Sequence, residues 1–130
     1  MLDLYYRELG EPREGELPLI MLHGLFGSAD NLGALARNLA SDFHIYAFDA
    51  RNHGRSPHSD TMGYDVLAAD VIAMLDKLGI KKARFFGHSM GGKTVMQIAL
   101  NYPEYVQSLV VADIAPVAYD HHHSTIFAAS

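Results

Sequence analysis

The sequence predicts an α/β fold with a mostly parallel sheet and flanking helices, because short apolar runs alternate with segments of helical periodicity. The apolar runs are continuous, which is typical of strands covered on both faces. The 130 residues suffice for one domain, and 49% of them are apolar, enough for a packed core. We therefore expect one α/β domain in which helices connect parallel strands by right-handed crossovers.

The first half of the chain carries three predicted strands and one predicted helix. A polar stretch with two glycines separates the first two strands and indicates a turn. Leucines and alanines recur at helical spacing in the segment predicted as helix. In chain order we expect a strand at 2–8, a strand at 18–22, a helix at 30–40 and a strand at 43–48.

The second half of the chain continues the alternation. In chain order we expect a helix at 64–78, a strand at 83–86, a helix at 90–101 and a strand at 108–112. Gly79 follows the first of these helices at the position where glycine commonly ends a helix. Pro103 lies just beyond the second helix and is expected to end it. The residues after Pro116 indicate the beginning of a further helix.

The turn between strand 83–86 and helix 90–101 carries the strongest signal of chemistry. Residues 87–91 read Gly-His-Ser-Met-Gly, a G-x-S-x-G pattern that is typical of a strained turn holding a serine hydroxyl above a sheet. Residues 87–94 also satisfy G-x-x-x-x-G-K-[ST], the pattern of a phosphate-binding P-loop. A glycine-rich turn without chemistry is the third interpretation. The local pattern leaves all three open.

A second glycine-rich loop favours the serine interpretation. Residues 23–27, His-Gly-Leu-Phe-Gly, follow the strand at 18–22, where an acyl-transfer enzyme needs a second donor for its oxyanion. We assign that donor to the backbone N–H of Leu25, with Phe26 as the fallback. The first donor is the N–H of Met90, at the start of the helix after the serine. A P-loop protein has no use for a second glycine-rich loop at this place.

Five blocks of sequence together resemble the α/β-hydrolase fold, and within it the YbfF-type esterase branch that includes the abhydrolase-11 proteins. The blocks are residues 23–28, 31–32, 49–56, 87–93 and 113–117. The resemblance implies a serine hydrolase of acyl esters or thioesters that uses no cofactor and no metal. It implies that Ser89 is the nucleophile, that Met90 and Leu25 form the oxyanion hole, and that Asp113 is the triad acid. The alternative for Asp113 is a capping role before Pro116.

The same resemblance implies that part of the enzyme is missing. The family's catalytic histidine follows the last strand of the fold, and these 130 residues end before it. We therefore expect residues 1–130 to be the N-terminal part of a hydrolase domain, in which Ser89 lacks its general base. The alternative is a non-catalytic fragment or interaction module. The outer edge of strand 108–112 would be open to self-association or to a complementing chain.

Other side chains near the motifs receive binding or structural roles. We expect Phe26 and His88 to border the substrate site, and His23 to bond to the backbone rather than to act in the chemistry. Residues 121–123, three consecutive histidines, indicate a solvated loop or a first helical turn and neither a zinc site nor a substitute base. The polar residues of the loop at 49–56 are expected to fix its turns.

Composition excludes several classes of function. A net charge of −5 argues against a nucleic-acid surface. The sequence contains no cysteine, which excludes a disulfide framework, a thiolate metal site and a cysteine nucleophile, and suits a reducing compartment such as the cytoplasm. The first residues do not resemble a signal peptide, and no apolar run approaches the roughly 20 residues of a membrane span. The expected partner is a small acyl ester or thioester.

Overall fold

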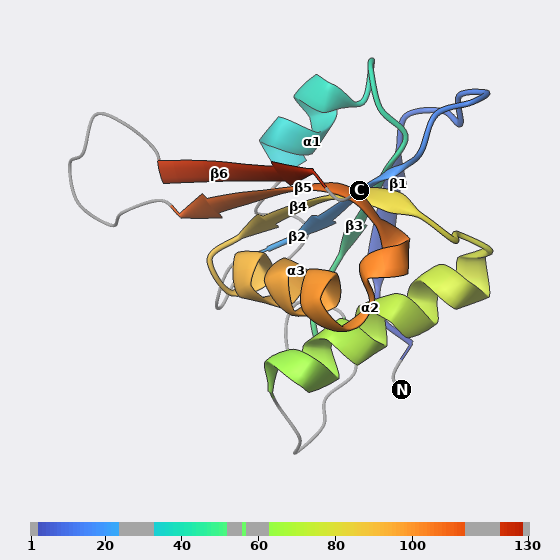
Figure 1. The fold of residues 1–130 in the computed structure, drawn as a ribbon. Helices are drawn as coiled ribbons and strands as arrows, with labels where there is room; N and C mark the ends of the chain where they lie inside the picture. The colour runs from blue at the N-terminus through green and yellow to red at the C-terminus, as the bar shows by residue number, and fades with distance from the viewer. Residues whose placement is uncertain (1–2, 24–32, 52–55, 57–62, 114–122, 129–130) are drawn as a thin grey trace.

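The computed structural model describes residues 3–23, 33–51, 56, 63–113 and 123–128. Helices and strands alternate through most of the chain, as the sequence predicts (Figure 1). The elements of the first half are β1 (Tyr6–Leu9), β2 (Leu19–Leu22), α1 (Gly33–Leu39) and β3 (Ile45–Phe48). Those of the second half are α2 (Tyr64–Leu78), β4 (Ala83–His88), α3 (Met90–Asn101), a 3₁₀ helix (Pro103–Tyr105), β5 (Val106–Asp113) and β6 (His123–Ala128).

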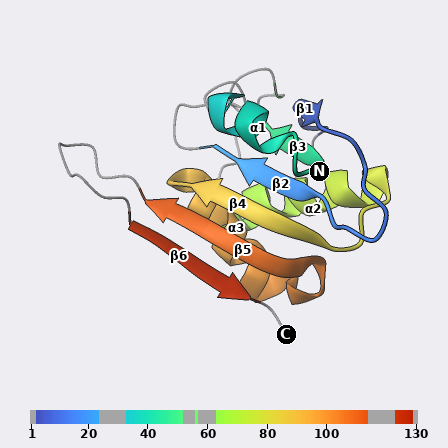
Figure 2. The same ribbon diagram turned by 90° about the horizontal axis from the view of Figure 1, so that it is seen from above.

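The described strands form one six-stranded sheet in the order β1-β3-β2-β4-β5-β6 (Figure 2). The four inner strands are parallel to one another, whereas β1 pairs antiparallel with β3 and β6 pairs antiparallel with β5 at the two ends of the order. In the centre, Leu22 of β2 pairs with Gly87 of β4, and Gly87 pairs in turn with Val111 of β5. The predicted α/β fold with a mostly parallel sheet is confirmed.

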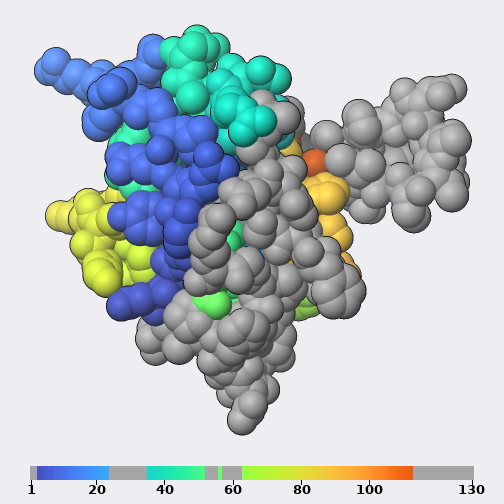
Figure 3. Space-filling model, turned by 180° about the vertical axis from the view of Figure 1, so that it is seen from behind, coloured from blue at the N-terminus to red at the C-terminus, as the bar shows by residue number. Residues whose placement is uncertain are grey.

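Helices cover both faces of the sheet, so its inner strands are buried on two sides as their apolar sequences predict (Figure 2). On one face, α2 and α3 pack through Leu75 and Ile98 on a core that includes Phe85 of β4. On the other face, α1 packs through Ala36 on Met21 of β2. Seen from behind, the N-terminal segment that includes β1 lies across the molecule beside the residues of α1 (Figure 3).

The helix ends follow the predicted signals. Gly79 has φ +76°. Its N–H donates to the carbonyl oxygen of Asp76 at 3.2 Å, and the N–H of Ile80 donates to the carbonyl oxygen of Leu75 at 2.8 Å. This left-handed glycine ends α2 because it satisfies the last carbonyls of the helix at no steric cost. Pro103 begins the 3₁₀ helix directly after α3, which is where the sequence places a stop.

The C-terminal segment differs from the prediction in two respects. Residues 123–128 form the strand β6 instead of continuing a helix, and β6 pairs with β5 from Ser108↔Ala128 to Asp113↔His123. The sequence Thr-Ile-Phe at 125–127 has the β-branched and aromatic residues that favour a strand. The expected open edge on strand 108–112 is therefore wrong, and so is the association site proposed along it, because β6 occupies that edge.

Two element boundaries also differ from expectation. The first strand is predicted at 2–8 but forms at Tyr6–Leu9, because β1 has only β3 as a partner and pairs from Tyr6↔Phe48 to Leu9↔Ile45. The helix predicted at 30–40 is α1 at 33–39, and residues 30–32 lie outside the described part of the chain. Within the described ranges, no helix is long and apolar enough to cross a membrane.

Candidate active site

Ser89 lies in the one-residue junction between β4 and α3, at the carboxyl end of the parallel strands. Its backbone has φ +56° and ψ −114°, and it alone among the described non-glycine residues has a positive φ. A side chain costs energy in this region, so the surrounding structure must impose the conformation. Ser89 is exposed to solvent, while Gly87 and Met90 on either side are buried.

The glycines around Ser89 make this junction sterically feasible. A Cβ on Gly87 would lie 2.3 Å from the carbonyl oxygen of Gly91, and a Cβ on Gly91 would lie 2.2 Å from that of Leu22. Real Cβ atoms do not approach backbone so closely, so both positions require glycine for close packing rather than for a special φ. At Gly92 the nearest atom is the Val111 side chain, 2.8 Å away. The turn is therefore packed directly against the end of β2.

The first turn of α3 begins immediately at this junction. The N–H of Lys93 donates to the carbonyl oxygen of Ser89 at 3.1 Å. The Thr94 hydroxyl donates to the carbonyl oxygen of Met90 at 3.0 Å. The N–H groups of the first helical residues have no acceptor within the helix, so they are available to an anion near Ser89.

This geometry argues against the P-loop interpretation. A P-loop needs an open loop whose N–H groups surround phosphates, but here Gly91, Gly92 and Lys93 already lie in α3. The Lys93 ammonium lies 5.8 Å from the centre of the Tyr64 ring on α2. The junction between strand and helix therefore consists of the single exposed residue Ser89.

Asp113 is the last residue of β5, and its backbone lies beside the serine turn. The strands pair up to His88↔Ala112, and the N–H of Ser89 then donates to the carbonyl oxygen of Ala112 at 3.1 Å. The peptide group that joins Ala112 to Asp113 is thus hydrogen-bonded to Ser89 itself. The sequence-predicted nucleophile and acid are brought together at one edge of the sheet.

The candidate oxyanion loop begins where β2 ends. His23 is 2% exposed, and its Nε2 accepts a hydrogen bond of 2.9 Å from the backbone N–H of Ala50. The prediction that His23 bonds to the backbone is confirmed. Leu25 and Phe26, assigned to the oxyanion hole and the substrate site, lie outside the described residues. His88, the other predicted pocket residue, is half-buried at the end of β4.

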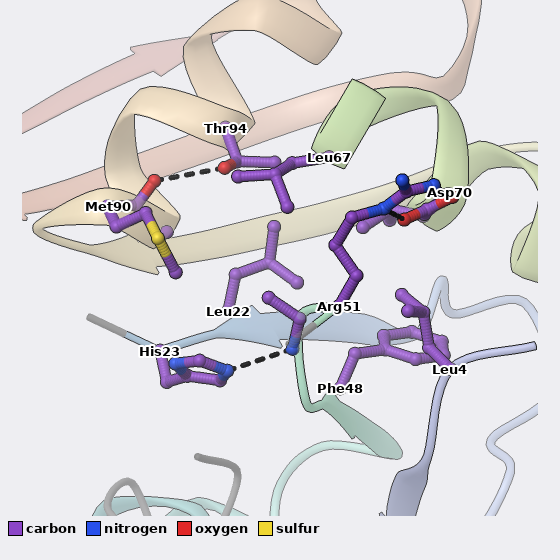
Figure 4. Close-up of a pocket in the computed structure, with 12 residues that line it drawn as sticks. Leu4, Leu22, His23, Phe48, Arg51, Leu67, Asp70, Met90 and Thr94 are labelled. Atoms are coloured by element: carbon purple, nitrogen blue, oxygen red, sulfur yellow. Dashed lines mark hydrogen bonds and ion pairs between the residues drawn. The ribbon is translucent and has the colours of Figure 1, made fainter. Parts of the chain in front are cut away.

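A small cavity of about 20 Å³ lies between the sheet and α2, next to the first turn of α3 (Figure 4). Met90 extends into it from the residue after the candidate nucleophile, and His23 lies at the same end. Most of the lining is apolar, and the polar groups are His23, Arg51, Asp70 and Thr94. The apolar lining residues are Leu4, Leu22, Phe48, Ala50, Leu67, Val71, Met90 and Gly91.

A buried ion pair forms one wall of this cavity. Arg51 donates through Nε to Asp70 Oδ2 at 2.6 Å and through Nη2 to Asp70 Oδ1 at 2.8 Å. Their side chains are 7% and 1% exposed. The hydrogen bonds to Asp70 raise the pKa of Arg51 above its ordinary value, against the opposing effect of burial, so the guanidinium stays charged. The pair ties the loop after β3 to α2.

Ser56 secures the same loop to the N-terminal segment. Its hydroxyl oxygen accepts a hydrogen bond of 2.8 Å from the N–H of Tyr5 and its hydroxyl donates to the backbone carbonyl of Asp49. Ser56 thus bonds back to Asp49 across the loop, as expected, whereas Arg51 bonds to α2. Asp70 is not predicted from the sequence as the partner of Arg51. Its signal is a carboxylate at a buried position of α2, three residues after Leu67 and one before Val71.

The described residues include no cluster of three His, Asp or Glu side chains that could hold a metal ion. The side chains of residues 121–123 are not among those described.

Comparison with known proteins identifies the family. A family profile described as the alpha/beta hydrolase fold matches residues 18–129. The chain belongs to the α/β-hydrolase family. The fold that the resemblance in the sequence implies is thus confirmed.

Relatives in this family include esterases and a lipase. Esterase YbfF of Escherichia coli (strain K12) is 50% identical over 113 residues, which cover 86% of this chain and 44% of the relative. The sn-1-specific diacylglycerol lipase ABHD11 of Xenopus tropicalis is 48% identical over 103 residues, which cover 78% of this chain and 32% of the relative. The predicted resemblance to the YbfF-type branch is confirmed.

A solved structure of a marine microorganism esterase has a TM-score of 0.83 and 45% identity to this chain. The match covers 93% of this chain and 45% of that one. This α/β hydrolase therefore spans less than half the length of these relatives.

Proposed function

We propose that this chain is the N-terminal part of a serine hydrolase that cleaves short or medium acyl esters or thioesters through an acyl-enzyme on Ser89. The observation that carries the proposal is the exposed Ser89 at φ +56°, held by close glycine packing at the start of α3. This backbone supports the proposal of a nucleophile elbow, a turn that aims a serine oxygen at the substrate carbonyl. The esterase and lipase relatives support the reaction class.

In the proposed mechanism, the Ser89 hydroxyl attacks the carbonyl carbon and the resulting oxyanion accepts hydrogen bonds from the N–H groups of Met90 and Leu25. A histidine takes the serine proton and passes it to the leaving alcohol or thiol. Asp113 orients that histidine. A water molecule then attacks the acyl-enzyme and releases the acid. Phe26, His88 and Met90 would border the acyl group.

We propose that the catalytic histidine comes from outside these 130 residues. The chain covers 44% of YbfF, which leaves more than half of that relative unmatched. Ser89 without a base is a weak nucleophile, and the oxyanion hole and binding alone retain only about 10³–10⁴-fold catalysis over water. We therefore expect the 130-residue chain to react slowly with a fluorophosphonate probe, which labels activated serines.

A chimera tests the proposal. Joining this chain to the unmatched C-terminal part of YbfF should restore labelling and hydrolysis of p-nitrophenyl butyrate. Ser89→Ala in the chimera should abolish both, whereas Ser108→Ala, at a serine hydrogen-bonded to its neighbour Gln107, should leave both unchanged. Alanines at residues 121–123 should also leave activity intact. Hydrolysis that survives Ser89→Ala would remove Ser89 from the mechanism.

The alternative is a non-catalytic fragment or interaction module. The exposure of Leu100 (76%) and Met96 (46%) beside a shallow apolar hollow on α3 favours it, because such surfaces commonly associate. In that case a folded chimera would remain unlabelled by the probe, and the isolated chain would associate as its concentration rises in analytical ultracentrifugation.

A further inference from the structure

Lys93 lies close to the candidate nucleophile, and the proposed mechanism gives it no role. It fills the lysine position of the G-x-x-x-x-G-K-[ST] pattern, although the geometry of the turn argues against a P-loop. Its N–H donates to the carbonyl oxygen of Ser89 at 3.1 Å. This hydrogen bond places Lys93 one helical turn after Ser89, at the start of α3.

The side chain of Lys93 extends from α3 toward the start of α2. Its Nζ lies 5.8 Å from the centre of the ring of Tyr64, the first residue of α2. Both helices begin at the same end of the sheet (Figure 1), and Leu67 in the first turn of α2 lines the same cavity as Met90 (Figure 4). Side chains on a helix lean toward its N-terminus. The ammonium therefore lies on the edge of the molecule that also carries Ser89.

An aromatic ring, and not a carboxylate, holds this ammonium. Lys93 and Tyr64 are both exposed, and in the part of the chain that the structure describes no carboxylate oxygen lies within ion-pair distance of Lys93 Nζ. Lys77 differs, because its Nζ lies 3.3 Å from Asp3 Oδ2. A tyrosine ring attracts a cation without cancelling its charge, and the ammonium keeps donors for a further group.

The two helix starts carry few other charges. Lys93 is the only charged residue of α3, and Asp65 is the only one in the first turn of α2. The Asp65 carboxylate lies against its own helix start, since a Cβ on Gly63 would be 2.9 Å from Asp65 Oδ1. The positive charge of Lys93 is therefore available at the edge where a substrate would approach Ser89.

From these positions we infer that Lys93 is a specificity-determining residue, whose ammonium binds an anionic group of the ester or thioester that Ser89 attacks. The inference rests on the proposed function and narrows its substrate class to esters that carry a carboxylate or a phosphate. Such a group accepts charge-assisted hydrogen bonds from an ammonium, whereas an uncharged ester gains nothing from it. The anion lies either on the acyl part or on the leaving group.

The test compares matched esters in the chimera with YbfF. For the acyl part, p-nitrophenyl butyrate is paired with the monoanionic p-nitrophenyl succinate, whose acyl chain has the same number of carbon atoms. For the leaving group, the butyryl thioester of mercaptopropionate is paired with that of its methyl ester. In each pair the measured quantity is the ratio of kcat/KM for the anionic substrate to kcat/KM for the neutral one.

Three variants isolate the charge of residue 93. Lys93→Met removes the charge and keeps most of the length, and Lys93→Arg keeps the charge. Lys77→Met is the control, because it removes a cation from the last turn of α2, at the opposite end of that helix from Tyr64. We expect the ratio to fall about 10-fold in Lys93→Met for at least one pair, and to stay within about threefold of wild type in the other two variants.

Salt separates charge recognition from a structural role. If Lys93 only joined α3 to α2 through Tyr64, its loss would affect both members of a pair alike. Charge recognition instead predicts that added sodium chloride lowers the ratio in the wild type and leaves it nearly constant in Lys93→Met. Circular dichroism establishes that each chimera is folded.

The outcomes distinguish the inference from the function beneath it. A lower ratio for only one pair supports the inference and identifies the part of the substrate that carries the anion. Equal ratios in wild type and Lys93→Met for both pairs would overturn the inference while leaving the proposed function intact. A folded chimera without Ser89-dependent hydrolysis of any of these substrates would contradict the proposed function, and the inference with it.

Discussion

The backbone conformation of Ser89 is energetically unfavourable for a residue other than glycine. Its φ of +56° and ψ of −114° lie in a region that costs a non-glycine residue about 1–3 kcal/mol. The cost is offset by the packing of β4 and α3 on either side. A serine in this conformation is consistent with selection for its hydroxyl and not for its contribution to the free energy of unfolding.

Replacing Ser89 by glycine should therefore stabilise the chain. We expect Ser89→Gly to have a free energy of unfolding about 1 kcal/mol higher than Ser89→Ala, because both lack the hydroxyl but only glycine adopts this backbone conformation without strain. Urea denaturation of the two variants measures the difference. Equal stability would mean that the turn imposes no strain on residue 89.

Gly91 is expected to tolerate no side chain. A Cβ there would meet the backbone of Leu22 at 2.2 Å, so Gly91→Ala must separate β2 from α3 and should destabilise the chain by at least about 3 kcal/mol. Gly92→Ala is the matched control, because its nearest contact is a side-chain atom of Val111 at 2.8 Å and its nearest backbone atom is 3.3 Å away, while alanine favours the helix. We expect the control to change stability by at most about 1 kcal/mol. Similar losses in both variants would contradict the packing argument.

At the scale of the elements, an ion pair joins α2 to the loop after β3, in addition to the apolar packing of α2 on the sheet. The Arg51–Asp70 pair is buried and joined by two hydrogen bonds, so removal of either partner leaves an uncompensated charge. We expect Arg51→Met and Asp70→Leu each to lower the free energy of unfolding by about 3–5 kcal/mol, and the double variant to recover most of that loss. Denaturation of all four proteins gives the coupling energy, and strictly additive losses would show that the two side chains act independently.

The link between α2 and the 3₁₀ helix should depend on pH. The Tyr105 hydroxyl donates to Asp76 Oδ1 at 2.7 Å, and this hydrogen bond is the main cause that raises the pKa of Tyr105 above its ordinary value. The neutral phenol is the donor, so the stabilisation is present below the ordinary tyrosine pKa and is lost as the pH rises through the raised one.

A spectrophotometric titration tests this assignment. Asp76→Ala should bring the Tyr105 pKa down toward its ordinary value of about 10, with Tyr105→Phe identifying the transition. Asp65→Ala, at another exposed carboxylate of α2, is the control and should leave the Tyr105 pKa unchanged. An unaltered Tyr105 pKa in Asp76→Ala would contradict the assignment.

At the scale of the whole molecule, local sequence patterns predict the helices and strands themselves more reliably than they predict which strands pair with one another. The apolar runs and the stops at Gly79 and Pro103 define the inner strands and long helices because their causes are local. Strand order depends on pairing between distant segments, and β6 shows the consequence, since a helix was expected there.

The candidate site was predictable to the extent that it depends on local turns. The serine turn and the backbone bond of His23 follow from motifs of a few residues. The partnership of Arg51 with Asp70 joins positions 19 residues apart, and only the folded chain reveals it. The roles of Ser89, Asp113, Leu25, Met90, Phe26 and His88 in the chemistry stay predictions.

The order of the central strands has a further consequence for evolution of the site. From β2 the chain goes first to β3 on one side and later to β4 on the other, so its winding direction reverses at the middle of the sheet. Connections that leave β2 and β4 diverge toward opposite layers and do not compete for the same space. Loops on this rim other than the one-residue β4–α3 junction can thus lengthen, shorten or exchange sequence between lineages, altering which molecules are admitted without disturbing strand pairing beneath.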